Sequence, residues 1–348
     1  MNTTASPGTP PSPTGQAPLR LGTRRSTLAM AQSGQVAEAV RAVTGRPVEL
    51  VEITTYGDTS REHLAQIGGT GVFVSALRDA LLAGEIDLAV HSLKDLPTAE
   101  PEGLALAAIP VRADARDVLV ARDGLTFEQL AAVGRPARIG TGSPRRMAQL
   151  NAWARALGRE IETVPIRGNI DTRLGFVRSG QLDAVVLAAA GLTRIGRLDE
   201  ATELLDPSHV LPAPGQGALA VECAATNTAL AARLAELDDP HTRIAVTAER
   251  SLLAALEAGC SAPVGALADL PPALGFARGW GDPQADGQVV TEMRLRGVVG
   301  SIDGTTLVQL STTGPVPASP GDAAALGREL AAEMLAKGAA GLMGERAH

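Results

Sequence analysis

The sequence predicts an α/β fold built from two α/β lobes, followed by a smaller α+β domain at the C-terminal end. Short β-type runs alternate with helical patterns through the first two thirds of the chain, which is typical of βα units and a largely parallel sheet. This alternation starts again near Asp117, and after about residue 240 a long helical pattern precedes two strands and a closing helix. The 348 residues, 45% of them apolar, suffice for one large core or two to three smaller ones.

The first series of elements begins at Leu19. Residues 19–23 are predicted to form a strand, and the helical pattern after it has Ser26 at its N-cap. A helix is predicted within residues 73–85. It is expected to end at Gly84, because glycine is common at helix ends. The other strands of this series are predicted at 48–55, 86–93 and 104–110.

The second series repeats the alternation and then gives way to different elements. Its strands are predicted at 117–121, 137–143, 162–169 and 183–191, and its helices at 127–133, 145–157 and 171–179. A loop rich in Pro and Gly then leads to a strand and a helix near residues 228–237. The last part is predicted to contain a helix over 240–259, antiparallel strands at 290–300 and 306–314, and a helix over 322–337.

Composition excludes several classes of protein. The net charge of −7 and the few aromatic residues argue against nucleic-acid binding by overall basicity or by base stacking. Residues 1–18 are predicted to be a disordered tail without a targeting signal, and no apolar run approaches the ~20 residues of a membrane span. We therefore expect a cytoplasmic protein, and the presence of only two cysteines, Cys223 and Cys260, fits a reducing compartment.

Positive charge is concentrated between Arg135 and Arg178. This window contains nine arginines, no lysines and three acidic residues, in a chain that is acidic overall. The guanidinium group suits two-point contact with carboxylates or phosphates, although an arginine-rich stretch is also often an ordinary solvated surface. The spacing favours binding, because GTGSPRR puts Ser143, Arg145 and Arg146 at the start of a helix that is suited to an anion.

Four arginines, two of them in this window, lie just after predicted strands or in the helix that follows, where α/β sheets form their ligand crevice. They are Arg24, Arg167, Arg173 and Arg194. So many guanidinium groups around one crevice would repel one another, so the expected ligand carries many carboxylates or phosphates.

An acid and a thiol stand out beside these bases. Lys94 and Asp95 end a buried strand and are either a structural ion pair or a catalytic site. Cys260 lies in a turn flanked by Gly and Pro, whereas Cys223 and His91 are expected to be buried structural residues. Metal-ligand spacings and nucleotide-binding glycine motifs are missing from the sequence, and we predict no metal.

Eight motifs in order resemble one known family. They are LGTRRSTLAMAQ, GGTGVFVSAL, IDLAVHSLKDLP, RIGTGSPRR, IRGNIDTRL, LAAAGLTR, LPAPGQGALAVEC and TAERSLLAALEAGCSAPVG. Together they resemble the porphobilinogen deaminase (hydroxymethylbilane synthase) family from about Leu19 to the C-terminus. The resemblance implies two lobes similar to periplasmic binding proteins and a third domain that presents a cysteine. The implied boundaries are 19–115 with 212–236 for the first lobe, 116–211 for the second, and 240–348 for the α+β domain.

The resemblance also implies an activity and a cofactor. Members of the family add four porphobilinogen molecules in turn, with loss of ammonia, to a dipyrromethane held by a cysteine thioether, and hydrolysis releases hydroxymethylbilane. The matching cysteine is Cys260, and Asp95 matches the catalytic aspartate that stabilises positive charge on pyrrole nitrogens. The family is usually monomeric.

The remaining roles follow from the same matching. Lys94, Ser143, Arg145 and Arg146 would hold the cofactor carboxylates. The residues implied to bind the substrate or the growing chain are Arg24, Ser26, Arg167, Arg173, Arg194 and Gln216. This chain departs from the family where basic residues are common, at Tyr56, Gln66 and Thr70, and where serine is frequent, at Gly142. The competing hypothesis is a non-enzymatic two-lobed protein that binds polyanions.

Overall fold

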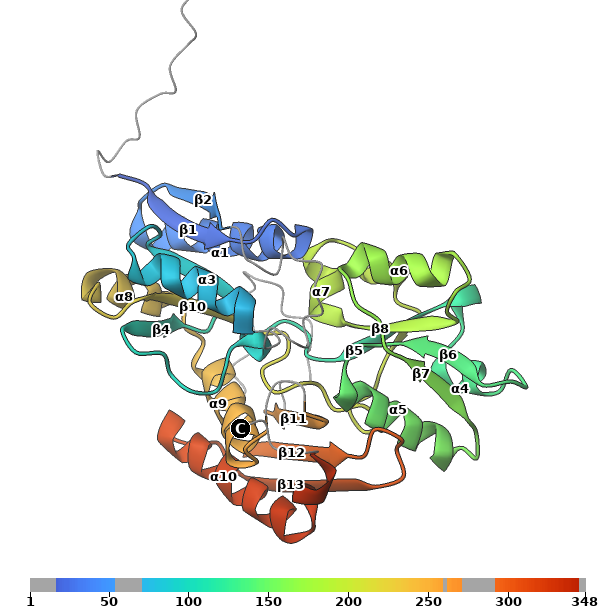
Figure 1. Cartoon of the computed structure of the whole chain (residues 1–348). Helices are drawn as coiled ribbons and strands as arrows, with labels where there is room; N and C mark the ends of the chain where they lie inside the picture. Colours follow the sequence, from blue (N-terminus) through green and yellow to red (C-terminus); the bar gives the residue numbers. More distant parts are fainter. Residues whose placement is uncertain (1–16, 54–70, 259–261, 271–291, 344–348) are drawn as a thin grey trace, which may run out of the picture.

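The first lobe is a five-stranded mixed sheet covered by helices on both faces. In the computed structural model, which describes residues 17–53, 71–258, 262–270 and 292–343, its strands are ordered β2-β1-β3-β10-β4 (Figure 1). Strand β1 is parallel to β2 and β3, whereas β10 is antiparallel to β3 and β4. The strands are β1 (Leu19–Thr23), β2 (Val48–Glu52), β3 (Leu88–Ser92), β4 (Leu104–Ala108) and β10 (Leu219–Ala224).

Alternation along these strands explains the helices on the two faces. In β3, Leu88 and Val90 belong to the core under α1 (Thr27–Thr44) and α8 (Thr228–Leu234), and Ala89 between them faces α3 (Gly71–Leu82). Such alternation is what a sheet buried on both sides requires. Ser26 caps α1 as predicted, because its hydroxyl accepts a hydrogen bond from the Ala29 N–H.

The second lobe repeats this arrangement with the strand order β7-β6-β8-β5-β9. Strand β6 is parallel to β7 and β8, and β5 is antiparallel to β8 and β9. The strands are β5 (Asp117–Ala121), β6 (Ala137–Gly140), β7 (Ile161–Val164), β8 (Ala184–Ala188) and β9 (Glu203–Leu204). The helices are α4 (Phe127–Ala131), α5 (Pro144–Ala156), α6 (Ile170–Arg178) and α7 (Ala189–Arg194). The prediction of largely parallel sheets is confirmed, with one exception in each lobe: β10 in the first sheet and β5 in the second run antiparallel to the other four strands.

The chain crosses between the lobes twice, along residues 109–116 and 205–218. The two crossing segments lie against each other, with the Ala113 N–H donating to the Gly217 carbonyl at 3.2 Å. Gly217 has a φ of 88°, and a Cβ there would lie 2.5 Å from the carbonyl oxygen of Ala113. Glycine is therefore required where the crossing segments meet.

The third domain is an antiparallel sheet with the order β11-β12-β13, packed against two helices. It contains α9 (Pro240–Ala255), β11 (Val264–Asp269), β12 (Glu292–Gly300), β13 (Leu307–Pro315) and α10 (Pro320–Ala336). Strand β11 was not predicted from the sequence. The turn between β12 and β13 lies on α5 of the second lobe, where Asn151 donates to the Ile302 carbonyl at 2.7 Å and Arg155 to that of Asp303 at 3.0 Å.

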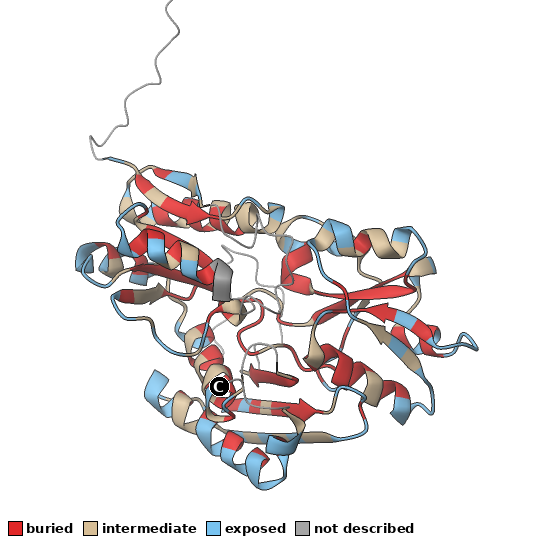
Figure 2. Ribbon diagram, in the orientation of Figure 1, coloured by how far each residue is buried: buried red, intermediate tan, exposed pale blue. Residues whose placement is uncertain are grey.

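Short 3-10 turns complete the described chain. They are η1 (Leu93–Asp95), η2 (Arg122–Gly124), η3 (Leu198–Glu200), η4 (Ala235–Leu237) and η5 (Ala339–Leu342). Figure 2 shows that the buried residues line the centres of both sheets and the junction with the third domain. In the portion of the chain covered by the structure, no helix is long and apolar enough to cross a membrane. Residues 1–16 of the predicted tail lie outside the described residues.

Candidate functional site

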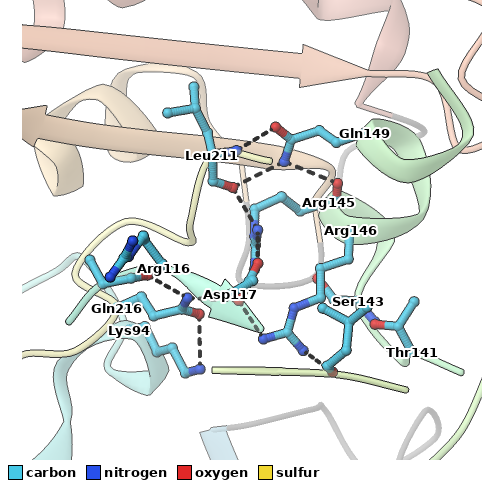
Figure 3. A network of polar contacts seen from close by, with 12 residues as sticks. Lys94, Arg116, Asp117, Thr141, Ser143, Arg145, Arg146, Gln149, Leu211 and Gln216 are labelled. Carbon is cyan, nitrogen blue, oxygen red and sulfur yellow. Dashed lines mark hydrogen bonds and ion pairs between the residues drawn. The ribbon is translucent and has the colours of Figure 1, made fainter. Parts of the chain in front are cut away.

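A buried carboxylate, Asp117, joins two of the predicted site residues. Asp117 opens β5 with no exposed surface, and its two oxygens accept hydrogen bonds from Arg145 and Arg146, each at 2.7 Å (Figure 3). Both guanidinium groups are themselves buried. Sequence reasoning placed Asp117 in a strand and missed this role. The available signal was a lone acid at the start of an otherwise apolar strand, DVLVA.

The start of α5 explains why both arginines point into the molecule. Pro144 occupies the first turn of the helix, and Arg145 and Arg146 follow it. Ser143 is the N-cap residue, but its hydroxyl makes no capping hydrogen bond to the helix. A Cβ at Gly142 would lie 2.6 Å from the Ile166 carbonyl oxygen, so the serine common in the family would have to shift the backbone here.

Each arginine has a second anchor on a backbone carbonyl. Arg145 donates to the Leu211 carbonyl at 2.6 Å, and Arg146 donates to the Val186 carbonyl at 3.0 Å. Gln149 holds the backbone of Leu211 by two hydrogen bonds. Its amide nitrogen donates to the Leu211 carbonyl at 3.0 Å, and its amide oxygen accepts from the Leu211 N–H at 2.7 Å. Within the described chain, the buried Nε of Arg146 has no hydrogen-bond partner.

Gln216 connects this cluster to the first lobe. Its amide nitrogen donates to Asp117 at 2.8 Å and to the Ala115 carbonyl at 2.7 Å, and its oxygen accepts from the Lys94 ammonium at 3.2 Å (Figure 3). Lys94 belongs to η1, directly after β3. We call Lys94, Asp117, Arg145, Arg146, Gln149, Leu211 and Gln216 the Asp117 network.

The Asp117 network carries more positive than negative charge. Burial alone would raise the pKa of Asp117, but Arg145 and Arg146 hold it far below its usual range, so the carboxylate stays ionised. Burial lowers the pKa of Lys94 to about 8, and the neighbouring arginines add to this while Asp95 and Asp117 oppose it. Three cationic groups therefore lie near Asp117, and even with the Asp95 carboxylate beside Lys94 one positive charge remains in surplus. An anionic ligand would offset the remaining charge.

A small cavity of about 40 Å³ borders the network. It is lined by Lys94, Ser143, Arg145, Ala213, Pro214, Leu253, Ala262 and Val264. Ala262 is two positions from Cys260, which lies outside the described residues, as do Tyr56, Gln66 and Thr70. A larger cavity of about 320 Å³, between α3 and residues 97–104, is lined by none of the predicted site residues.

Asp95, the predicted catalytic residue, is partly buried at the end of η1. Strand β3 leads into this turn, and the flanking Leu93 and Leu96 are buried in the core. Asp95 is close enough to Lys94 to raise the pKa of that ammonium against the effect of burial. The turn therefore holds the carboxylate beside the cationic network.

Two of the predicted substrate-binding arginines lie close to the network. Arg194, at the end of α7, donates to the Gly217 carbonyl at 2.6 Å, next to Gln216, and burial lowers its pKa to about 10. Arg173 on α6 donates to the Gly168 carbonyl at 2.8 Å. Burial and the charge of Arg146 both lower the pKa of Arg173, so the guanidinium groups of Arg173 and Arg146 are near enough to repel each other.

Gln216, also predicted to bind substrate, belongs to the Asp117 network, whereas Arg167, Arg24 and Ser26 lie outside it. Arg167 is exposed in the loop between β7 and α6. Arg24 and Ser26 lie between β1 and α1, where the Ser26 hydroxyl is occupied by its capping bond. The lobes approach each other at this helix, because a Cβ at Gly191 of α7 would lie 3.9 Å from Leu28 of α1.

Comparison with known proteins gives a consistent result along the chain. Residues 19–232 match the family model described as "Porphobilinogen deaminase, dipyromethane cofactor binding domain", and residues 243–336 match "Porphobilinogen deaminase, C-terminal domain". Porphobilinogen deaminase 1 of Streptomyces avermitilis is 77% identical over 95% of this chain and 98% of its own length. Porphobilinogen deaminase 1 of Streptomyces coelicolor is 75% identical over 94% and 98%.

Among solved structures, a periplasmic binding protein of Salmonella typhimurium aligns with a TM-score of 0.38 and 16% identity, over 65% of this chain and 96% of that one. This alignment is too weak to support an argument. The two family models and the two close relatives are sufficient. The chain belongs to the porphobilinogen deaminase family.

Proposed function

We propose that this protein condenses four porphobilinogen molecules head to tail, with release of ammonia, on a dipyrromethane bound to Cys260, and releases hydroxymethylbilane by hydrolysis. The observation that carries this proposal is the surplus positive charge of the Asp117 network beside a cavity that reaches Ala262. Each pyrrole ring of the substrate and of the growing chain carries two carboxylates. The unbalanced positive charge of the network would bind the carboxylates of such a polyanion.

Polar groups at the cavity and in the adjoining Asp117 network are suited to the carboxylates of a tethered pyrrole pair. The buried Nε of Arg146 lacks a partner in the described part of the protein, and the Ser143 hydroxyl is not used in capping. We assign the carboxylates of the dipyrromethane to Lys94, Ser143, Arg145 and Arg146, and its thioether to Cys260. When bound, this group supplies the nucleophilic pyrrole carbon that accepts the first substrate.

Asp95 is the proposed catalytic residue. Loss of ammonia breaks the C–N bond of the substrate's aminomethyl group and leaves a cationic pyrrole. A carboxylate near the pyrrole N–H stabilises this charge and can move the protons needed for ammonia departure and for restoring the aromatic ring. The position of Asp95 in η1, beside Lys94, supports this assignment.

Arginines around the network are assigned to the substrate and the growing chain. Arg173 and Arg194 approach from the second lobe, Arg167 lies in the loop before α6, and Arg24 and Ser26 lie at the start of α1. Gln216 contributes differently, because its amide nitrogen already donates to Asp117 and Ala115. We assign it to orienting Lys94 and Asp117. We further propose that the protein is a cytoplasmic monomer that binds neither nucleic acid nor membranes.

The proposal is tested by measuring the mass of the denatured protein. We expect an excess over the sequence mass of 35.6 kDa equal to two linked pyrroles, carried by the peptide that contains Cys260. The excess should disappear in Cys260→Ser and remain in Cys223→Ala, the control, because Cys223 is buried in β10. Asp95→Asn should keep the excess and lose about 10²–10³-fold in turnover of porphobilinogen, the scale for removing one electrostatic group.

Two results would contradict the proposal. An unmodified protein with full turnover would exclude the thioether at Cys260. Near-normal turnover in Asp95→Asn would show that this carboxylate is dispensable. A protein that binds porphobilinogen but releases no ammonia would instead support the polyanion-binding hypothesis.

A further inference from the structure

Helix α9 of the third domain holds the turn that carries Lys94 and Asp95. The guanidinium of Arg250 donates to the carbonyls of Leu93 at 3.1 Å, Leu96 at 3.0 Å and Pro97 at 2.7 Å. Leu93 is the first residue of η1, and Leu96 and Pro97 follow the turn, so the three carbonyls lie on both sides of Asp95 in the sequence. One side chain from a distant part of the sequence therefore ties down both ends of this short turn.

The physical properties of arginine suit this contact. A 3-10 turn of three residues has little hydrogen bonding of its own, so its carbonyls need partners. The planar guanidinium can serve several carbonyls at once, which the single ammonium of lysine cannot do in the same geometry. Val246, one helical turn before Arg250, packs in the same buried cluster as Leu93 and Leu96. The same face of α9 thus supplies both apolar and polar contacts to the turn.

The neighbouring residue fixes α9 to the crossing segments and to β11. Both oxygens of Glu249 accept from Arg112, at 2.6 and 2.9 Å. Glu249 also accepts the Gly215 N–H at 2.7 Å and the Ala268 N–H at 2.9 Å. Since α9 ends at Ala255, five positions before Cys260, one rigid helix connects the turn of Asp95 with the segment that bears the cysteine.

We propose that Arg250 is a positioning residue, which fixes the backbone that carries the Asp95 carboxylate by holding η1 against α9. This inference rests on the proposed function, because it concerns how Asp95 reaches the reacting pyrroles. Arg250 acts through the backbone of residues 93–97. Reactions between positioned groups are sensitive to small shifts, and a displacement of about 1 Å can cost about 10²-fold in rate.

The test compares Arg250→Ala, Arg250→Gln and Arg250→Lys with the control Arg243→Ala. Arg243 lies on the same helix, two turns before Arg250, and pairs with Asp238 at 2.7 Å. In proteins whose mass shows a loaded Cys260, we expect kcat to fall about 10- to 100-fold in the alanine and glutamine variants, with KM within about threefold. Lysine should restore part of kcat, and added guanidinium ion should raise kcat of the alanine variant but not of the control.

A second measurement reports on the turn directly. Hydrogen exchange at the backbone amides of residues 93–96 should be faster in Arg250→Ala than in the wild type, and unchanged in Arg243→Ala. Unchanged kcat in the folded Arg250 variants would overturn the proposal, and so would a loss of kcat that only follows the unfolded fraction. The absence of ammonia release in the wild type would count against the proposed function, whereas unchanged exchange in residues 93–96 would count against Arg250 alone.

Discussion

Two buried carboxylates, Asp117 and Glu249, have similar partners, but the charges around them balance only at Glu249. Both have no exposed surface, and both bind arginine. Glu249 meets one guanidinium and two backbone N–H groups, which together match its charge and its lone pairs. Asp117 meets two guanidinium groups and the amide of Gln216, with Lys94 as the next neighbour.

The difference separates a structural ion pair at Glu249 from the binding site that we propose at Asp117. A balanced buried pair has nothing left to offer a ligand, and its removal affects mainly stability. A buried group with surplus charge is costly until an opposite charge arrives, so it favours the bound state. Counting the charges around each buried carboxylate therefore distinguishes the two roles, although the residue types are the same.

The largest expected effect comes from neutralising each carboxylate in turn. Asp117→Asn leaves two buried guanidinium groups without an anion, and Glu249→Gln leaves one. We expect losses in the free energy of unfolding of about 5 kcal/mol and about 3 kcal/mol respectively, within the range for breaking a buried pair. Denaturant titration of both variants measures this. A larger loss in Glu249→Gln than in Asp117→Asn would contradict the assigned charge balance.

The next effect concerns pH. The pKa of Lys94 in the folded protein is about 8, below its ordinary value of 10.5. From about pH 8 upward the unfolded chain binds more protons than the folded one, so this group makes the ligand-free protein more stable as pH rises towards 10.5. Over the same range the site loses a positive charge, and kcat/KM for porphobilinogen should fall.

The variant Lys94→Arg isolates this effect, since arginine keeps its charge throughout this range. We expect the fall in kcat/KM above about pH 8 to be much reduced in Lys94→Arg, whatever the variant's absolute rate. Rate measurements at a series of pH values between neutral and alkaline conditions test the prediction. An identical decline in the variant would assign the titration to another group.

The smallest effect contrasts two serines at helix starts. The Ser26 hydroxyl caps α1, whereas the Ser143 hydroxyl does not cap α5. Ser26→Ala should cost about 1 kcal/mol in the free energy of unfolding, the usual value for a lost cap. Ser143→Ala should leave stability nearly unchanged and weaken retention of the anionic group. Thermal unfolding of both variants gives the comparison, and equal losses would show that Ser143 is a structural residue.

The sequence predicted the elements and the arginines well because both leave local signals. Alternating apolar runs predicted the strands of both lobes, and GTGSPRR predicted the start of α5 with its two arginines. The antiparallel strands β5 and β10 were not foreseen, because strand direction depends on distant connections. Asp117, Glu249 and Arg250 were also missed, since a buried acid in a strand or a charged pair on a helix acquires its role only from tertiary contacts.

The position of β10 has a consequence for how the chain is made. Among the described strands, β4 is hydrogen-bonded to β10 and to no other, and the whole second sheet lies between them in the sequence. During synthesis, the second lobe can close while β3 and β4 still expose unpaired edges, and such edges are prone to pairing with other chains. The sheet of the first lobe therefore stays incomplete until the late strand β10 has been synthesised. A ribosome that stalls before Leu219 would release a nascent chain that is prone to aggregation.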